Sequence, residues 1–237
     1  MIRGIILFLL LVAMVIPTSL KFLLTLVLGN SHNQIYPFES PLVLTLEHLG
    51  LVLITSLFSF ILGVSGAVFS YWHEKSHIRG LLQSTGAILQ TVPPLAFLAL
   101  AIPLLGFGTV PVFWSLTIFG ILPIFHSSLS GFESINKEVS GASVGLGFSK
   151  VQKLLWVDLP LAFPSILSGI RTSVMINIGT AAIAATMGSG GLGKPIIAGI
   201  SEFHYSYLLQ GSLTAALLAL LADWGLQRRK KRPPKII

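Results

Sequence analysis

Two short stretches hold residues whose types and spacing could do chemistry. His73-Glu74-x-x-His77 has the H-E-x-x-H spacing, which on a helix places two imidazoles on one face to bind Zn²⁺, with the glutamate as general base. A catalytic zinc needs a third protein ligand, and the only aspartates, Asp158 and Asp223, lie in no recognisable ligand motif. The stretch also lies in a polar connection between two apolar runs. We therefore interpret it as a solvated loop and keep a zinc intramembrane protease as the enzymatic alternative.

The second stretch, 188–193, reads Gly-Ser-Gly-Gly-Leu-Gly and matches the G-x-G-x-x-G pattern. A dinucleotide site needs a strand before this pattern, a helix after it and an acidic residue about 20 residues further on. An apolar run precedes the pattern here, so we expect a tight re-entrant turn instead. The sequence has no Walker A motif and no cysteine, which excludes ATP hydrolysis by this chain and any disulfide or thiolate metal site. We expect no cofactor and no enzymatic activity.

The elements that must position these residues are long and apolar. The chain has 237 residues, of which 53% are hydrophobic and only 10% charged, whereas a soluble domain has about 25% charged residues. Most of its surface must therefore face lipid, where backbone polar groups pair within helices and about 20 apolar residues cross the bilayer. The apolar runs cover about 5–25, 46–70, 81–105, 109–128, 161–186 and 206–226. They predict an all-α integral membrane protein with about six transmembrane helices.

We expect a single transmembrane domain over 1–237, with a first span at 5–25, five core spans over 46–226 and a basic tail at 227–237. If the N-terminus lies inside and the spans alternate, twelve of the fifteen lysines and arginines fall on the inner side, six of them in the tail. Inner loops of membrane proteins are enriched in these residues. We therefore expect both termini in the cytoplasm and the tail against anionic membrane lipid. No soluble fold is left to carry nucleic acid, which excludes nucleic-acid binding.

Polar and helix-breaking residues inside the spans form a candidate translocation pathway. The candidates are Gln90, Pro93, Pro94, Ser173, Asn177 and Thr180. The two prolines remove two backbone donors near the middle of the third span, a break that is tolerated only against protein or a wet cavity. The last three residues lie at i, i+4 and i+7 on one face of the fifth span. Two alternatives remain open for them: they line a pore, or they form hydrogen bonds that hold helices together.

Two further features of the spans predict contacts between helices. Arg171 lies within the fifth span, where a charge needs a partner. Asp223 is the best candidate, and the alternative is that Arg171 extends to the headgroups. The second span carries a stripe of small residues that predicts close helix packing, namely Ser56, Ser59, Gly63 and Gly66.

The loop at about 129–159 mixes apolar and charged residues at helical spacing, interrupted by Gly145 and Gly147. It predicts two short helices at the membrane surface. The loop resembles the cytoplasmic signature of importer-type ABC permeases, E-A-A, three residues, G, nine residues, I-x-L-P. The matching positions are Gly141, Ala142, Ser143, Gly147, Val157, Leu159 and Pro160. This resemblance implies a type I ABC importer permease fold, in which these positions form the coupling helix and its turn. Gly141 stands where the family has glutamate, and Ser143 where it has the second alanine.

Other stretches, which together with the loop cover roughly 45–226, resemble the osmoprotectant subgroup of these permeases. They are Gln90-Thr91-Val92-Pro93-Pro94, Gly106-Phe107-Gly108, Ile170-Arg171-Thr172, Asn177-Ile178-Gly179-Thr180 and Gly190-Gly191-Leu192-Gly193. The resemblance implies import of glycine betaine or a related quaternary ammonium compound across the bacterial inner membrane. It also implies three partners: a cytoplasmic ABC ATPase subunit, a second permease subunit and an extracytoplasmic solute-binding protein.

Two alternatives to this function remain besides the zinc protease. An ABC permease for another small solute, such as an amino acid, would differ only in what it carries. A secondary transporter would have repeated halves and buried acidic residues for ion coupling. The sequence has neither feature, since Glu47 and Asp223 fall near the ends of spans.

Overall fold

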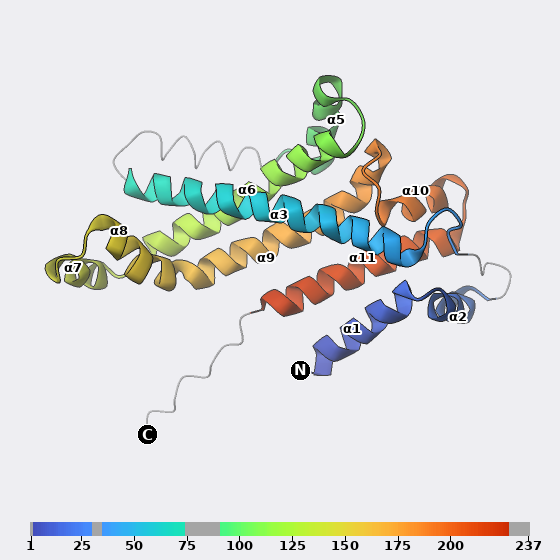
Figure 1. Cartoon of the computed structure of the whole chain (residues 1–237), viewed down its shortest axis with the longest axis horizontal. Helices are drawn as coiled ribbons and strands as arrows, with labels where there is room; N and C mark the ends of the chain where they lie inside the picture. The colour runs from blue at the N-terminus through green and yellow to red at the C-terminus, as the bar shows by residue number, and fades with distance from the viewer. Residues whose placement is uncertain (1, 30–34, 74–90, 228–237) are drawn as a thin grey trace.

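The computed structural model describes residues 2–29, 35–73 and 91–227, and within these ranges it contains helices and no strand. This confirms the predicted all-α fold. The helices are α1 (Ile2–Val15), α2 (Pro17–Leu28), α3 (Pro41–Trp72), α5 (Pro94–Leu105), α6 (Thr109–Glu133), α7 (Lys137–Gly145), α8 (Lys150–Lys153), α9 (Leu159–Ala184), α10 (Gly193–Ser201) and α11 (Tyr205–Leu226). A π-helical turn, Leu154–Asp158, joins α8 to α9. The long helices run along one axis and form an elongated bundle (Figure 1).

Within the described residues, four helical segments are long and apolar enough to cross a membrane: α3, α6, the continuous run Lys150–Met187, and α11. Helices α1 and α2 meet at 98° and add a fifth only if the bent pair forms one span. The run predicted as a first span at 5–25 is thus bent at Pro17, and whether it forms one span stays a prediction. Pro17 lacks a backbone N–H, and the residue before it, Ile16, is extended with φ −83° and ψ 119°.

The predicted third span at 81–105 lies partly outside the described residues. Its described part is α5, which has 12 residues and begins at Pro94. The predicted basic tail lies outside the described residues from 228 onward. The number of six spans therefore stays a prediction.

Small residues set the distances between the central helices α3, α6 and α9. A Cβ atom added to Gly63 of α3 would lie 2.9 Å from Ile124 Cγ2 of α6, and one added to Gly169 of α9 would lie 2.8 Å from the carbonyl oxygen of Pro123. Ser59 Oγ also donates a hydrogen bond of 2.8 Å to the carbonyl oxygen of Thr117 on α6. The stripe of small residues predicted for the second span is confirmed as a close packing face.

The helix α11 packs against α9 and α10, and α1 packs against α11. Arg171 of α9 forms an ion pair with Asp223 of α11, from its Nε to the carboxylate Oδ1. This confirms the predicted partner of the arginine in the fifth span. The pair joins two helices that are neighbours in space, although 52 residues separate its members.

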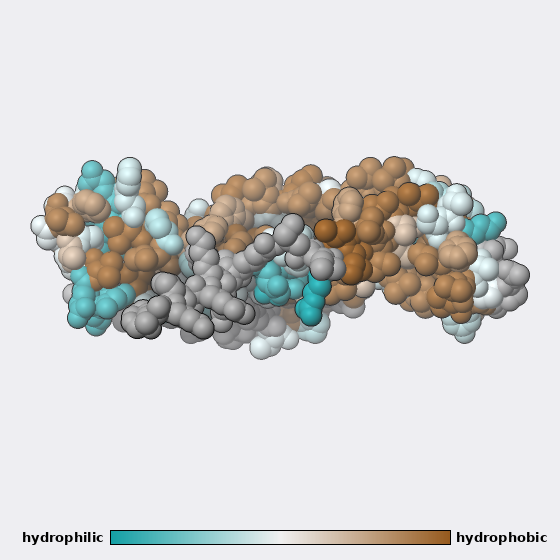
Figure 2. All heavy atoms as spheres, turned by 90° about the horizontal axis from the view of Figure 1, so that it is seen from below, coloured by the Kyte–Doolittle hydropathy of each residue, from teal (hydrophilic) through white to brown (hydrophobic). Residues whose placement is uncertain are grey.

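The bundle has two ends of different composition. We call the end with α7, α8 and the C-terminus of α3 the α7 end, and the end with α10, the turn at 188–191 and the N-terminus of α3 the α10 end (Figure 1). In the face shown in Figure 2, hydrophobic side chains cover much of the length between the ends, and hydrophilic side chains lie at the two ends and in a smaller patch near the middle, beside the grey atoms. This distribution fits a protein whose sides face lipid and whose ends face water.

Candidate functional site

At the α7 end, local capping builds the two short helices that the loop sequence predicts. Asn136 caps α7 by accepting a 2.8 Å hydrogen bond from the backbone N–H of Glu138. Ser149 and Gln152 form a reciprocal capping box that starts α8. Between the helices, Gly147 has a φ of +82°, a left-handed conformation that side chains disfavour. The structure differs from the expectation in one respect: α8 is not a separate helix but continues through the π-helical turn into α9.

The predicted coupling residues fall on both sides of this glycine turn. Gly141, Ala142 and Ser143 lie on α7, Gly147 lies in the turn, and Leu159 and Pro160 begin α9. Among the three on α7, only Ser143 is buried, and its hydroxyl donates a 2.7 Å hydrogen bond to the carbonyl oxygen of Ser140. A Cβ atom at Gly141 would meet nothing within 4 Å.

The outer surface of α7 and its turn carries exposed apolar side chains. Val144 is 62% exposed and Leu146 is 77% exposed. Both lie outside the four helical segments that could cross a membrane. Exposed apolar side chains rimmed by polar ones commonly mark a surface that a partner protein covers.

A buried ion pair anchors the α7 end, and sequence reasoning missed it. Lys153 Nζ lies 2.9 Å from Asp158 Oδ2 and donates a 3.3 Å hydrogen bond to the hydroxyl of Tyr71 at the C-terminus of α3. Asp158 is only 2% exposed. Tyr71 in turn stacks on Phe132 of α6, with 5.1 Å between the ring centroids. The pair therefore connects the loop to α3 and α6 as well as to α9.

The predicted pathway residues lie in different surroundings. Ser173, Asn177 and Thr180 are all buried on the face of α9 that packs against α3 and α6. Asn177 Nδ2 donates a 3.2 Å hydrogen bond to Ser56 Oγ of α3, which is the kind of contact that the packing alternative requires. The pore alternative for these three residues stays a prediction.

The two prolines mark the start of α5. Pro93 has extended geometry, with φ −58° and ψ 138°, and its carbonyl oxygen accepts a 2.9 Å hydrogen bond from the N–H of Ala96. Helix α5 then packs against α6 and α9, where Phe97 makes an edge-on ring contact with Phe119 at 5.3 Å. The remaining pathway candidate, Gln90, lies outside the described residues.

At the α10 end, the glycine stretch forms a tight turn, as expected. Gly188, Gly190 and Gly191 have φ values of +85°, +83° and +74°. The N–H of Gly191 donates a 2.9 Å hydrogen bond to Glu47 Oε2 of α3. A Cβ atom at Gly191 would lie 3.0 Å from the Cβ of His48, so the turn lies directly against α3.

Three charged residues from separate segments meet beside this turn. Lys194 of α10 forms an ion pair with Glu39, which precedes α3, and its Nζ lies 3.5 Å from Glu47 Oε2. The hydrogen bond to Glu39 raises the pKa of the Lys194 ammonium above its ordinary value, so Lys194 stays charged at neutral pH. All three side chains are partly exposed.

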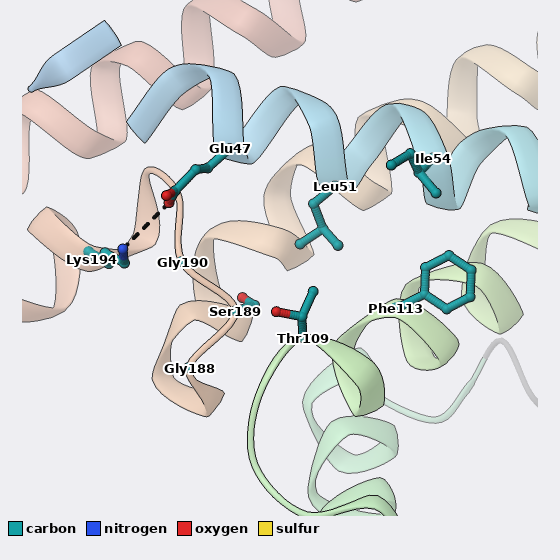
Figure 3. A pocket seen from close by; sticks show the side chains of 9 residues that line it. All are labelled: Glu47, Leu51, Ile54, Thr109, Phe113, Gly188, Ser189, Gly190 and Lys194. Carbon is teal, nitrogen blue, oxygen red and sulfur yellow. Dashed lines mark hydrogen bonds and ion pairs between the residues drawn. The ribbon is translucent and has the colours of Figure 1, made fainter. Parts of the chain in front are cut away.

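A cavity of about 480 Å³ opens next to these charges. It is lined by Glu47, Leu51, Ile54, Thr109, Phe113, Gly188, Ser189, Gly190 and Lys194. Figure 3 shows Glu47 and Lys194 at one end of the cavity and Ile54 and Phe113 at the other. Thr109 and Ser189 lie close together on the wall opposite α3. The cavity lies between α3, the start of α6 and the glycine turn. We call it the α10-end cavity.

The zinc hypothesis finds little support in the described residues. His73 ends α3, and its Nδ1 lies 2.9 Å from the carbonyl oxygen of Phe69. Glu74 and His77 lie outside the described residues. Within 2–29, 35–73 and 91–227, no three histidine, aspartate or glutamate side chains come together as a metal site would require.

Sequence comparison identifies the family of the chain. Residues 59–232 match the family described as binding-protein-dependent transport system inner membrane component. The chain belongs to this family. It is therefore an ABC transporter permease subunit, and the family is one of transporters rather than of enzymes.

Two curated relatives extend this result. The chain is 36% identical over 190 residues to the osmoprotectant import permease protein OsmW of Salmonella typhimurium, covering 78% of this chain and 87% of the relative. It is 35% identical over 190 residues to the glycine betaine/carnitine/choline transport system permease protein OpuCB of Bacillus subtilis, covering 80% of this chain and 87% of the relative.

Structure comparison agrees on the fold. The chain is similar to the permease fold of an inward-facing MetNI methionine ABC transporter, with a TM-score of 0.69 over 76% of this chain and 89% of that chain. The sequence identity is only 18%, so this likeness concerns the fold. It supports the type I ABC permease fold that the loop signature implies.

Proposed function

We propose that this permease subunit carries glycine betaine or a related quaternary ammonium osmoprotectant. The observation that carries the proposal is the identity of 35–36% to permeases named for osmoprotectant, glycine betaine, carnitine and choline transport, over about four fifths of the chain. For the amino-acid alternative, the fold likeness to a methionine transporter gives little support, because an identity of 18% is too low to indicate a solute.

Uptake of radiolabelled solutes tests the proposal. The chain is expressed with the ATPase and binding protein of its own transport system in cells that lack other betaine importers. We expect uptake of glycine betaine, carnitine or choline that stops when the ATPase is inactivated, and no uptake of methionine. Uptake of an amino acid without any quaternary ammonium compound would contradict the proposed solute.

The proposed orientation places the α7 end in the cytoplasm and the α10 end outside the inner membrane, with both termini cytoplasmic. In this arrangement an ATPase docks at the α7 end, a solute-binding protein docks at the α10 end, and a second permease subunit completes the pathway. The excess of basic residues on the inner side supports this orientation.

Because the chain has no cysteine, single cysteines at Ser149 and Ser201 can be labelled from outside intact cells with an impermeant thiol reagent. Labelling should reach Ser201→Cys and not Ser149→Cys, and the reverse result would invert the topology.

The proposed coupling element is α7 with its glycine turn, comprising Gly141, Ala142, Ser143 and Gly147, and the start of α9 at Leu159 and Pro160. Two features support this role. The exposed Val144 and Leu146 offer an apolar surface to a partner. The Lys153–Asp158 pair ties the same segment to α3, so a displacement of α7 would be passed to the bundle rather than absorbed in a flexible loop.

The proposed pathway lies alongside α5 and α9, near Pro93 and Pro94. Gln90, which lies outside the described residues, stays a candidate from the sequence. The α9 residues Ser173, Asn177 and Thr180 either line the pathway or hold its wall in place. The contact between Asn177 and Ser56 supports the second role. Transport and stability measured on the same Asn177 variant separate the two roles.

A further inference from the structure

The α10-end cavity combines a carboxylate with an apolar wall. Glu47, Leu51 and Ile54 follow one another at i, i+4 and i+7 along one face of α3. Phe113 of α6 closes the far end of this wall (Figure 3). The volume of about 480 Å³ falls in the range of sites for small molecules, roughly 300–1,000 Å³. The cavity therefore has room for a small solute that is both charged and methylated.

Among the described residues, the charges beside the cavity do not balance. Two carboxylates, Glu39 and Glu47, share one ammonium, that of Lys194. Lys194 is bound directly to Glu39, whereas its distance to Glu47 Oε2 is 3.5 Å, and the side chain of Glu47 is 42% exposed. Glu47 and Lys194 both line the cavity, whereas Glu39 does not. Because Glu39 is the carboxylate that pairs most closely with Lys194, the remaining negative charge of the cluster lies on Glu47 and favours a cation beside it.

A second feature of the cavity is an unsatisfied hydroxyl. Ser189 Oγ is inaccessible to solvent and has no hydrogen-bond partner among the described residues. It lies close to Thr109 in the cavity wall (Figure 3). Buried hydroxyls without a partner cost free energy, and a rotation of this side chain toward the cavity would let the hydroxyl donate to a bound acceptor such as a carboxylate.

These features match the chemistry of a quaternary ammonium compound. Such a cation keeps its charge at every pH, is coated with methyl groups and donates no hydrogen bond, so it is bound best by aromatic or apolar walls near a negative charge. An inorganic cation would instead need several oxygen ligands, and the cavity wall between Leu51 and Phe113 is apolar.

We propose that the α10-end cavity is a capture site for a quaternary ammonium compound, in which Glu47 balances the cationic charge and Leu51, Ile54 and Phe113 contact the methyl groups. The choice of a quaternary ammonium solute rests on the proposed function, whereas the preference for a cation rests on the cavity itself. The site would hold the solute on the permease after its release at the α10 end and before it moves along the bundle.

Thiol labelling in membrane vesicles tests the capture site. Thr109→Cys places a single thiol in the cavity wall, because the chain has no other cysteine. It is treated with two methanethiosulfonate reagents that share a reactive group, one carrying trimethylammonium and one carrying sulfonate. The measured quantity is the ratio of the labelling rate with the cationic reagent to that with the anionic reagent. We expect this ratio to be roughly three- to tenfold higher at Thr109→Cys than at the control Phe107→Cys, because an attractive charge lies in a partly exposed site. Phe107 is 74% exposed and does not line the cavity.

Two charge variants and one pair of solutes complete the test. Glu47→Gln keeps an oxygen that accepts a hydrogen bond from the N–H of Gly191, so the turn is retained. The loss of the negative charge in this variant should abolish most of the preference for the cationic reagent. Glu202→Gln, an exposed residue outside the cavity, should leave it unchanged. Glycine betaine should slow labelling of Thr109→Cys, whereas 3,3-dimethylbutanoate, which has the same shape without the positive charge, should not.

The outcomes separate this inference from the proposed function. If vesicles with the wild-type importer take up glycine betaine but Thr109→Cys shows no cationic preference, the capture site is refuted and the proposed function stands. The capture site is also refuted if Glu47→Gln leaves the preference for the cationic reagent unchanged, or if glycine betaine does not slow the labelling of Thr109→Cys. If the preference depends on Glu47 while wild-type uptake of glycine betaine is absent, the cation site is supported and the proposed solute is wrong.

Discussion

The two ends of the bundle use ionic groups in opposite ways. At the α7 end one lysine meets one aspartate, and Asp158 is 2% exposed. At the α10 end two glutamates share Lys194, and the side chains are 29–42% exposed. A buried pair with balanced charge resists the loss of either partner, because the remaining charge would be left without compensation. An exposed cluster with unbalanced charge contributes little to stability but produces a local potential that a ligand can use.

This contrast suggests a division of labour. The ionic groups at the α7 end connect α8 and the π-helical turn to Tyr71 of α3, which suits the mechanical contact proposed for this end. At the α10 end, Glu47 accepts a hydrogen bond from the glycine turn and holds it in place, and the same carboxylate also lines the cavity. Four predictions test the comparison, from the largest expected effect to the smallest.

Removing one member of the buried pair should have the largest effect. Asp158→Asn leaves Lys153 without its counter-charge in a site that is mostly buried, and we expect a loss of stability of about 3 kcal/mol. Thermal unfolding of the purified protein in detergent measures it. The double variant Lys153→Met with Asp158→Leu removes both charges and should recover most of the loss. If Asp158→Asn unfolds at the same temperature as the wild type, the pair does not anchor the α7 end.

The glycine turn at the same end should respond next. Gly147→Val places a β-branched residue at a φ of +82°, where the strain is roughly 1–2 kcal/mol. We expect α7 to be misplaced, so that solute uptake falls while ATP hydrolysis by the assembled complex continues.

Two variants control for this effect. Gly145→Ala, at a helical position with open space around it, should behave as wild type. Gly141→Glu restores the residue that the family signature has, and the open space there should let it be tolerated or tighten docking of the ATPase. Normal coupling in both Gly147→Val and a deletion of 138–147 would rule out the loop as the coupling element.

The buried hydrogen bond in the middle of the bundle should have a smaller effect. Asn177→Leu removes the donor to Ser56 Oγ, and bonds of this kind in membrane bundles contribute about 1 kcal/mol or less. If the α9 residues hold helices together, the melting temperature of Asn177→Leu should fall. Adding Ser56→Ala to this variant should lower the melting temperature little further. If they line the pathway, uptake should slow with normal melting. A variant that is normal in both respects would exclude both roles.

The exposed cluster should contribute least to stability. Lys194→Met should lower the unfolding free energy by less than about 1 kcal/mol, because exposed ion pairs are screened by water and salt. Since Glu39 raises the pKa of Lys194, the contribution of this lysine is present below its unfolded value and is lost only as pH rises through the higher folded value. Melting should therefore not change through loss of this charge between about pH 7 and pH 9. A loss as large as that of Asp158→Asn would remove the contrast between the two ends.

Much of the α7 end could be predicted because its signals are local. The apolar runs, the caps at Asn136 and Ser149, and the glycine between them lie within a few residues of the features they control. The ion pair was not predictable in the same way. Lys153 and Asp158 are five residues apart, a spacing that shares a face only where the helix widens into a π turn. The hydropathy pattern does not report such a turn.

The sequence by itself determined that this chain is an all-α membrane protein, which family it resembles and where its glycine turns lie, because hydropathy, loop charge and backbone freedom are properties of short segments. It also named Asp223 as the best candidate partner of Arg171, since a charge within a span has few possible partners, but the structure decided between this pair and an arginine that extends to the headgroups. Only the tertiary structure decided that Glu39, Glu47 and Lys194 meet, across separations of 147 and 155 residues. The physical reason is that the contacts between distant helices depend on their rotation and register. The close packing of small residues on α3, α6 and α9 helps to set both, and the outcome depends on the whole bundle at once.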